Sequence, residues 1–105
     1  GFNLRMKALR SFTENLPRVN FKIKSTPLIG INTEKSMESG VINGTINEII
    51  QNISDYQQLH PEINVILTGG DTTFIKSIVS TKKNSIFADE NLTLKGLNTV
   101  LIYND

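Results

Sequence analysis

The feature that most constrains the fold is the apolar run 63–67, which leads directly into Thr68-Gly69-Gly70-Asp71. Five apolar-rich residues that end in a glycine pair predict a buried strand followed by a sharp turn. Glycine tolerates positive φ and lets the backbone come close to a flat ring or a ribose. The alternative is a tight structural turn with Asp71 as the cap of the next helix. Both interpretations place the run in an α/β protein.

Three other stretches have helical periodicity. The first has apolar residues three and four apart over 2–16 and ends before Pro17. The second is expected to begin at Asn32 or Thr33, which are both good caps, and to run to about residue 59. Its apolar stripe is Ile42, Ile46, Ile49, Ile50, Ile53 and Tyr56. Helices are also expected after Asp71 and around 94–101.

Few segments are available to form the sheet. Residues 19–24 alternate apolar and polar side chains, which predicts an edge strand, and Ile86-Phe87 predicts a short extended piece. One central strand with at most a short edge strand cannot cover four helical faces. A buried backbone amide without a partner costs about 1–3 kcal/mol. We therefore expect the chain to be part of a larger domain, mostly helical with one central strand.

Composition excludes several classes of protein. The 105 residues include no cysteine, so disulfides and thiolate metal sites are excluded. No apolar stretch approaches the roughly 20 residues that span a bilayer, so we expect a cytoplasmic protein without a membrane partner. Residues 1–24 hold six cationic residues against Glu14 alone. This segment could contact phosphates or nucleic acid, or could be a solvated helix face. The segment has only three aromatic residues, Phe2, Phe12 and Phe21, and we do not expect a nucleic-acid partner.

Three residues of the second helix stand out. Gly40 and Gly44 lie one turn apart, and each costs up to about 1 kcal/mol relative to alanine in a helix interior. Their spacing indicates close packing of another backbone, a second subunit or a substrate. Thr33 could cap the helix or donate a hydrogen bond to a small polar substrate. No carboxylate pair, phosphate-binding loop with lysine, or metal-ligand cluster accompanies them.

In order and spacing, five parts of the sequence resemble the carboxy-terminal part of the type III pantothenate kinases. These enzymes phosphorylate pantothenate with ATP, the first step toward coenzyme A. The resemblance covers nearly the whole chain. Its parts are 1–9 with 12–17, Asn32-Thr33 with 40–44, 65–71, 86–89, and 92–98.

The resemblance implies an α/β, ribonuclease H-like fold, as in actin and the sugar kinases, with 1–105 as a partial carboxy-terminal domain. It implies a homodimer formed through the helix of Gly40 and Gly44. It also implies that Thr33 contacts pantothenate and that Gly69 and Gly70 face the adenosine of ATP. The catalytic base, the phosphate loops and the ligands of the monovalent cation (K+ or NH4+) and the divalent metal would lie in an absent amino-terminal portion.

The resemblance leaves alternatives open. It makes the strand at 19–24 less secure, since the family often has a connecting segment there. Some relatives of the kinases act as accessory transcription factors, so a non-catalytic regulatory protein is the second hypothesis. A self-standing helical interaction module is the third. By the first interpretation, the 105 residues alone have no kinase activity.

Overall fold

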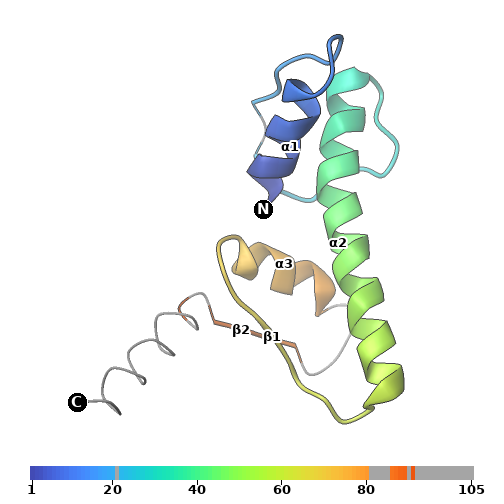
Figure 1. Cartoon of the computed structure of the whole chain (residues 1–105), viewed down its shortest axis with the longest axis vertical. Coiled ribbons are helices and arrows are strands. Elements are labelled where there is room, and N and C mark those ends of the chain that lie inside the picture. The colour runs from blue at the N-terminus through green and yellow to red at the C-terminus, as the bar shows by residue number, and fades with distance from the viewer. Residues whose placement is uncertain (21, 81–85, 90, 92–105) are drawn as a thin grey trace, which may run out of the picture. The chain divides into compact units, whose positions relative to one another are not determined.

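The computed structural model describes residues 1–20, 22–80, 86–89 and 91. The chain divides into two compact units, Gly1–Asp55 and Tyr56–Asp105. The elements in chain order are α1 (Phe2–Ser11), α2 (Thr33–Leu59), β1 (Val65–Leu67), α3 (Thr72–Val79) and β2 (Ile86–Ala88) (Figure 1). The helix predicted around 94–101 and the motif at 92–98 lie outside the described residues.

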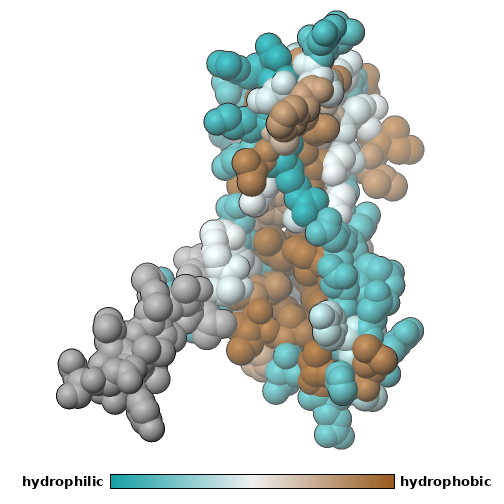
Figure 2. Space-filling view, in the orientation of Figure 1, coloured by the Kyte–Doolittle hydropathy of each residue, from teal (hydrophilic) through white to brown (hydrophobic). Residues whose placement is uncertain are grey.

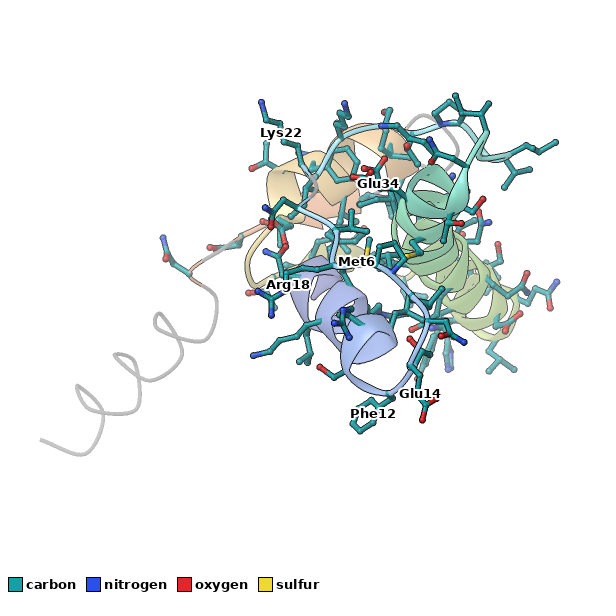
Figure 3. The ribbon with its side chains drawn as sticks, turned by 90° about the horizontal axis from the view of Figure 1, so that it is seen from above. Met6, Phe12, Glu14, Arg18, Lys22 and Glu34 are labelled. Carbon is teal, nitrogen blue, oxygen red and sulfur yellow. The ribbon has the colours of Figure 1, made fainter. Side chains whose placement is uncertain are left out.

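The predicted first helix is confirmed, but it is shorter than the sequence pattern indicates. Phe2 and Met6 are buried, and the helix ends at Ser11. The hydroxyl of Thr13 donates a hydrogen bond to the Leu9 carbonyl, which competes with continuation of the helix. Phe12 is 87% exposed, so its assignment to the buried face is wrong. In Figure 3, Met6 points toward α2 and Phe12 points away from the helices.

The predicted edge strand at 19–24 is wrong. The described residues of this segment, which exclude residue 21, have no strand conformation. A strand needs a neighbour to take its backbone hydrogen bonds, and β1 and β2 pair with each other instead. The apolar side chain of Val19 is nevertheless buried, at 9% exposure. The apolar residue at position 19 therefore anchors a connector on the core and is not part of a strand.

The long helix α2 has the predicted bounds, and half of its predicted apolar stripe is buried, namely Ile42, Ile46 and Ile53. Met37, Val41, Ile42, Ile46 and Ile53 are buried. Tyr56 is 60% exposed, so the stripe ends earlier than predicted. The helix is 27 residues long, but neither it nor any other described helix is apolar enough to cross a membrane.

The second unit contains a parallel two-stranded sheet, which corrects the prediction of a single central strand. β1 pairs with β2 in the register Val65↔Ile86, Ile66↔Phe87 and Leu67↔Ala88. A further backbone hydrogen bond joins Asp89 N to Leu67 O at 2.8 Å. The helix α3 lies between the strands in sequence and packs against β2. This order is a β–α–β unit, the usual connection between parallel strands.

One face of this sheet is open in the described part of the chain. Ile66 and Phe87 are paired across the strands, so they point to the same face, and each is 52% exposed. Each strand also has only one paired edge among the described residues. Parallel sheets are normally covered on both faces. The observed sheet therefore has both an apolar face and backbone edges that further structure could cover.

Candidate functional site

The amino terminus of α2 is capped by Asn32 and not by Thr33. The side-chain Oδ1 of Asn32 accepts a hydrogen bond from Lys35 N at 2.8 Å, and its backbone carbonyl accepts one from Ser36 N at 2.9 Å. Of the two caps that the sequence allowed, the first is the one used. The hydroxyl of Thr33 is therefore not needed for capping, and Thr33 is exposed at the first turn.

Exposed apolar side chains come just before Thr33 in the sequence. Leu28, Ile29 and Ile31 are 72%, 82% and 91% exposed, so the connector presents a small apolar surface just before the helix. Figure 2 shows apolar side chains protruding where Figure 1 draws the connector beside α2. A free hydroxyl next to exposed aliphatic side chains suits a small ligand that has both a polar and an aliphatic part.

The connector is held tightly against α2. Ser39 Oγ donates to the Leu28 carbonyl at 2.5 Å, and Asn43 Nδ2 donates to the Thr26 carbonyl at 3.2 Å and to Ser39 Oγ at 2.9 Å. A Cβ on Gly30 would lie 2.3 Å from Ser36 N, so only glycine allows this approach. Sequence reasoning missed the role of Gly30. Its only signal was a glycine two residues before a cap.

A buried carboxylate lies on the second turn of α2. The side chain of Glu38 is 8% exposed, and its Oε2 is 3.1 Å from Lys35 Nζ. A buried charge is tolerated when it is paired. This ion pair directs the Lys35 side chain along the helix toward Glu38, two residues from Thr33.

The glycine turn has an unusual backbone. Gly69 has φ of +97°, and Asp71 is left-handed at φ 63° and ψ 8°. Asp71 precedes α3, but its side chain makes no capping hydrogen bond, so the predicted Asp71 cap is wrong in its chemistry. The left-handed backbone accounts for the difference, since capping residues usually have extended φ and ψ. Only the Asp71 carbonyl bonds to the helix, accepting from Ile75 N at 3.0 Å.

The turn is open where a ligand would approach it. A Cβ added to Gly69 or Gly70 would have no heavy atom of the described residues within 4 Å. Thr72, the first residue of α3, is 1% exposed, and its Oγ1 has no hydrogen-bond partner within the described part of the chain. A buried hydroxyl without a partner is uncommon. Sequence patterns do not indicate this buried hydroxyl, because threonine is common in the first turn of a helix.

The glycine face of α2 is also open. A Cβ on Gly40 or Gly44 would have no atom within 4 Å, so no described part of the chain provides the close packing that their spacing predicted. Gly40 borders an apolar groove of about 540 Å³ in the first unit. The groove is lined by Arg5, Ala8, Leu9, Phe12, Thr13, Gly40 and Val41.

An ion pair joins α1 to α2 in this first unit. Arg5 Nη1 and Nη2 donate to the two carboxylate oxygens of Glu48 at 3.1 and 3.0 Å. The hydrogen bond and the positive charge of Arg5 hold the pKa of the Glu48 carboxyl below its usual value. The same contact raises the pKa of the Arg5 guanidinium. The pair is solvent-exposed, so it orients the two helices more than it stabilises them.

The candidate residues are distributed over both units. Thr33, Gly40 and Gly44 lie in Gly1–Asp55, whereas Gly69 and Gly70 lie in Tyr56–Asp105. No group of three or more His, Asp or Glu side chains in the described residues could hold a metal ion. The candidate residues offer a hydroxyl, an aliphatic surface, and an open glycine turn with positive φ.

These features define a class of protein: a helix-rich α/β fold with a β–α–β unit and an open glycine turn. The family model for type III pantothenate kinase matches residues 1–55. The chain belongs to the type III pantothenate kinase family.

Relatives named as type III pantothenate kinases match nearly the whole chain. The protein from Phocaeicola vulgatus is 44% identical over 105 residues, which is all of this chain and 42% of the relative. Those from Christiangramia forsetii and Cytophaga hutchinsonii are 41% and 43% identical over 99% of this chain, and the matches cover 41% and 43% of their own lengths. The chain thus spans about two fifths of the length of these relatives.

Proposed function

We propose that this chain is the carboxy-terminal portion of an enzyme that phosphorylates pantothenate with ATP in coenzyme A biosynthesis. The single observation that carries the proposal is the match of all 105 residues to relatives named as type III pantothenate kinases. The open face and edges of the β1–β2 sheet support the proposal that the chain is a portion of a larger domain. In a complete ribonuclease H-like domain, further strands would pair with the edges and helices would cover the face. We place the enzyme in the cytoplasm.

Thr33 is proposed to orient pantothenate. Pantothenate has hydroxyl, amide and carboxylate groups on an aliphatic skeleton, and Thr33 offers a hydroxyl that is not used for helix capping, beside the exposed Leu28, Ile29 and Ile31. The Asn32 cap and the ties of Ser39 and Asn43 keep the connector fixed. A held hydroxyl loses little freedom on binding, which favours orientation of the substrate.

Gly69 and Gly70 are proposed to receive the nucleoside of ATP. The turn lies at the carboxyl end of β1, the end of parallel strands where ligands bind in open α/β sheets. In the part of the chain that the structure describes, no atom lies within 4 Å of a Cβ placed on either glycine, which leaves space for a ring at the backbone. Removal of the proton from pantothenate and neutralisation of the phosphates are assigned to residues outside this chain. The monovalent cation (K+ or NH4+) and the divalent metal are assigned there as well.

The test uses two variants in the complete enzyme. Thr33→Val should raise KM for pantothenate about 10-fold through loss of one hydrogen bond, while Thr33→Ser should keep it within about threefold. Gly70→Ala has room for its methyl group in this chain, so it should raise KM for ATP without a change in stability. Unchanged KM values for both substrates in both variants would contradict these assignments. The 105 residues alone should not hydrolyse ATP in the presence of pantothenate.

A homodimer is part of the proposal. The apolar groove at Gly40 contains the 87% exposed Phe12 and is continuous with an unoccupied glycine face of α2. A large exposed aromatic side chain beside such a groove is typical of an interface. The second hypothesis, a non-catalytic accessory protein, has no support from the three relatives, which are all named as kinases.

A further inference from the structure

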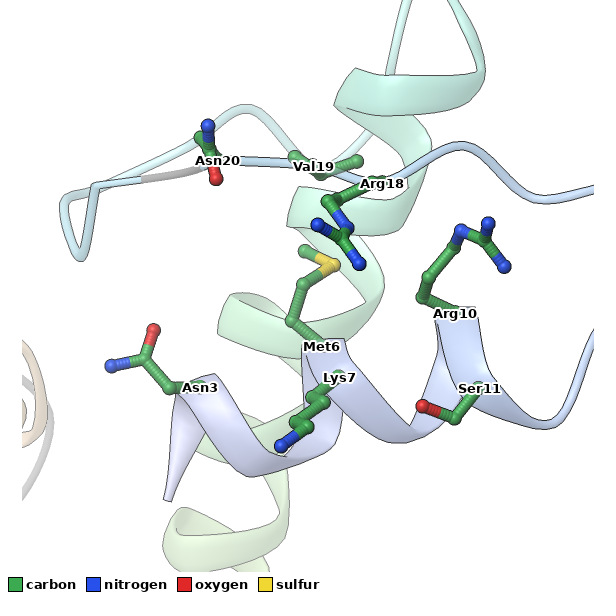
Figure 4. A pocket seen from close by; sticks show the side chains of 8 residues that line it. All are labelled: Asn3, Met6, Lys7, Arg10, Ser11, Arg18, Val19 and Asn20. Carbon is green, nitrogen blue, oxygen red and sulfur yellow. The ribbon is translucent and has the colours of Figure 1, made fainter.

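A second hollow, of about 390 Å³, lies in the first unit between α1 and the segment that follows it (Figure 4). Its size falls within the range of small-molecule pockets. It shares no residue with the Thr33 region, the glycine turn or the groove at Gly40. The lining residues are Asn3, Met6, Lys7, Arg10, Ser11, Arg18, Val19 and Asn20.

The hollow is strongly basic. Lys7, Arg10 and Arg18 line it, and none of its described lining residues is acidic. In the described residues the ion pairs are Arg5–Glu48 and Lys35–Glu38, so none of these three cations is neutralised there. Three positive charges around one space repel each other, and this cost is reversed when an anion binds between them.

The sequence explains why these three cationic residues line one hollow. Asn3, Lys7 and Arg10 are spaced by four and three residues, which places them on one face of α1. Arg18 comes from the connector and precedes Val19, which is buried at 9% exposure. In Figure 4 the Arg18 side chain extends back toward α1 and Met6. The buried Val19 therefore holds the Arg18 backbone opposite the helix.

The lining also contains neutral groups that suit a particular ligand. Asn3, Ser11 and Asn20 provide hydrogen-bond donors, and the buried Met6 and Val19 provide an apolar floor. Guanidinium groups bind phosphate oxygens in a bidentate manner. Among the residues that the structure describes, those that line the hollow include no aromatic side chain of the kind that stacks on nucleic-acid bases.

We infer that this hollow binds a phosphate-bearing small molecule, with its phosphate between Arg10, Arg18 and Lys7 and an aliphatic part over Met6 and Val19. The inference does not depend on the proposed kinase activity, because its residues are separate from those assigned to pantothenate and ATP. Inorganic phosphate and organic phosphate esters share the recognising chemistry. The apolar floor distinguishes them, since only an ester has a group that can cover it.

The experiment is calorimetric titration of the 105-residue chain and of the complete enzyme with inorganic phosphate and, separately, with butyl phosphate. Butyl phosphate should bind several-fold more tightly than inorganic phosphate. Arg18→Gln and Arg10→Gln should each weaken both ligands by about 10-fold or more, as expected for loss of one charge-assisted hydrogen bond. The matched control is Lys24→Gln, a cation of the same basic segment that does not line the hollow. It should change affinity less than about twofold.

Three results would overturn the inference. The first is no binding of either ligand at about 10 mM, well above the millimolar range of weak sites. The second is an equal loss of affinity in Lys24→Gln and Arg18→Gln, which would indicate diffuse attraction by the whole basic segment. The third is preference for an oligothymidylate over butyl phosphate. Far-UV circular dichroism checks that each variant is folded, and Lys7→Gln, on the exposed side of α1, replaces any variant that is not.

Discussion

Replacing Gly30 with alanine should destabilise the first unit more than any other single methyl group at a described glycine. The new Cβ would lie 2.3 Å from Ser36 N, 2.6 Å from Lys35 C and 2.7 Å from Ser36 Cα. All three are backbone atoms of the first turns of α2, which cannot rotate away as a side chain can. Ordinary contact begins near 3.4 Å, so the connector must move by about 1 Å.

The magnitude follows from what the connector would lose. The hydrogen bonds from Ser39 to Leu28 and from Asn43 to Thr26 hold it against α2. Each such bond contributes about 1 kcal/mol. Loss of both gives about 2 kcal/mol, which agrees with the 1–3 kcal/mol typical of overpacking. For a domain of this size the melting temperature should fall by about 10 °C.

The assay is urea-induced unfolding followed by far-UV circular dichroism. Gly44→Ala is the matched control, because its Cβ would meet no atom within 4 Å and alanine favours a helix interior. It should raise the free energy of unfolding by about 0.5–1 kcal/mol. The same chemical change thus has opposite signs at the two sites. If Gly30→Ala were as stable as the parent, the close approach of the connector to α2 would be refuted.

Three further predictions concern the first unit. Arg5 holds the pKa of Glu48 below its usual 4.5, so this carboxylate stabilises the folded state above that pH. The contribution is lost as the pH falls through the lower pKa that Glu48 has in the folded state. In urea unfolding, the parent and Glu48→Gln should therefore differ in stability at pH 7 and converge in acid. Thr45→Val should stabilise the fold by about 1 kcal/mol, because the buried Thr45 Oγ1 has no partner within the described residues; a loss of stability would reveal one. Phe12→Ser should weaken self-association at least about 10-fold in sedimentation velocity, as expected for an aromatic residue that anchors an interface. The control is Leu4→Ser, which should leave self-association unchanged because Leu4 is on α1 and 69% exposed but does not line the groove.

Local patterns predicted the helices well. The bounds of α2 followed from the Asn32 cap and the proline after residue 60, and α3 followed from the glycine pair and its apolar residues. These signals are short-range, because capping and periodicity depend on neighbours within a few residues. The end of α1 was missed for the same kind of reason. A side-chain hydrogen bond from Thr13 to Leu9 competes with the helix, and periodicity does not register it.

Pairing could not be predicted in the same way. Alternation at 19–24 looks like a strand, yet Ile86–Ala88 is the segment that pairs with β1. A strand exists only if a partner lies beside it, which depends on residues far apart in the chain. The same limit applied to the sites. The sequence singled out Gly69 and Gly70 as candidates, and their role stays a prediction, whereas the contact of Gly30 with Ser36 and the basic hollow at Arg18 required the structure.

The open sheet has a practical consequence for work with these residues. Ile66 and Phe87 form an exposed apolar surface, and in the described part of the chain the outer strand edges present unpaired amides and carbonyls. Such edges serve as templates for intermolecular pairing. When produced without a covering partner, the chain should therefore aggregate in a concentration-dependent way. Charged substitutions at Ile66 or Phe87 would then improve its solubility while damaging any protein in which that surface is covered.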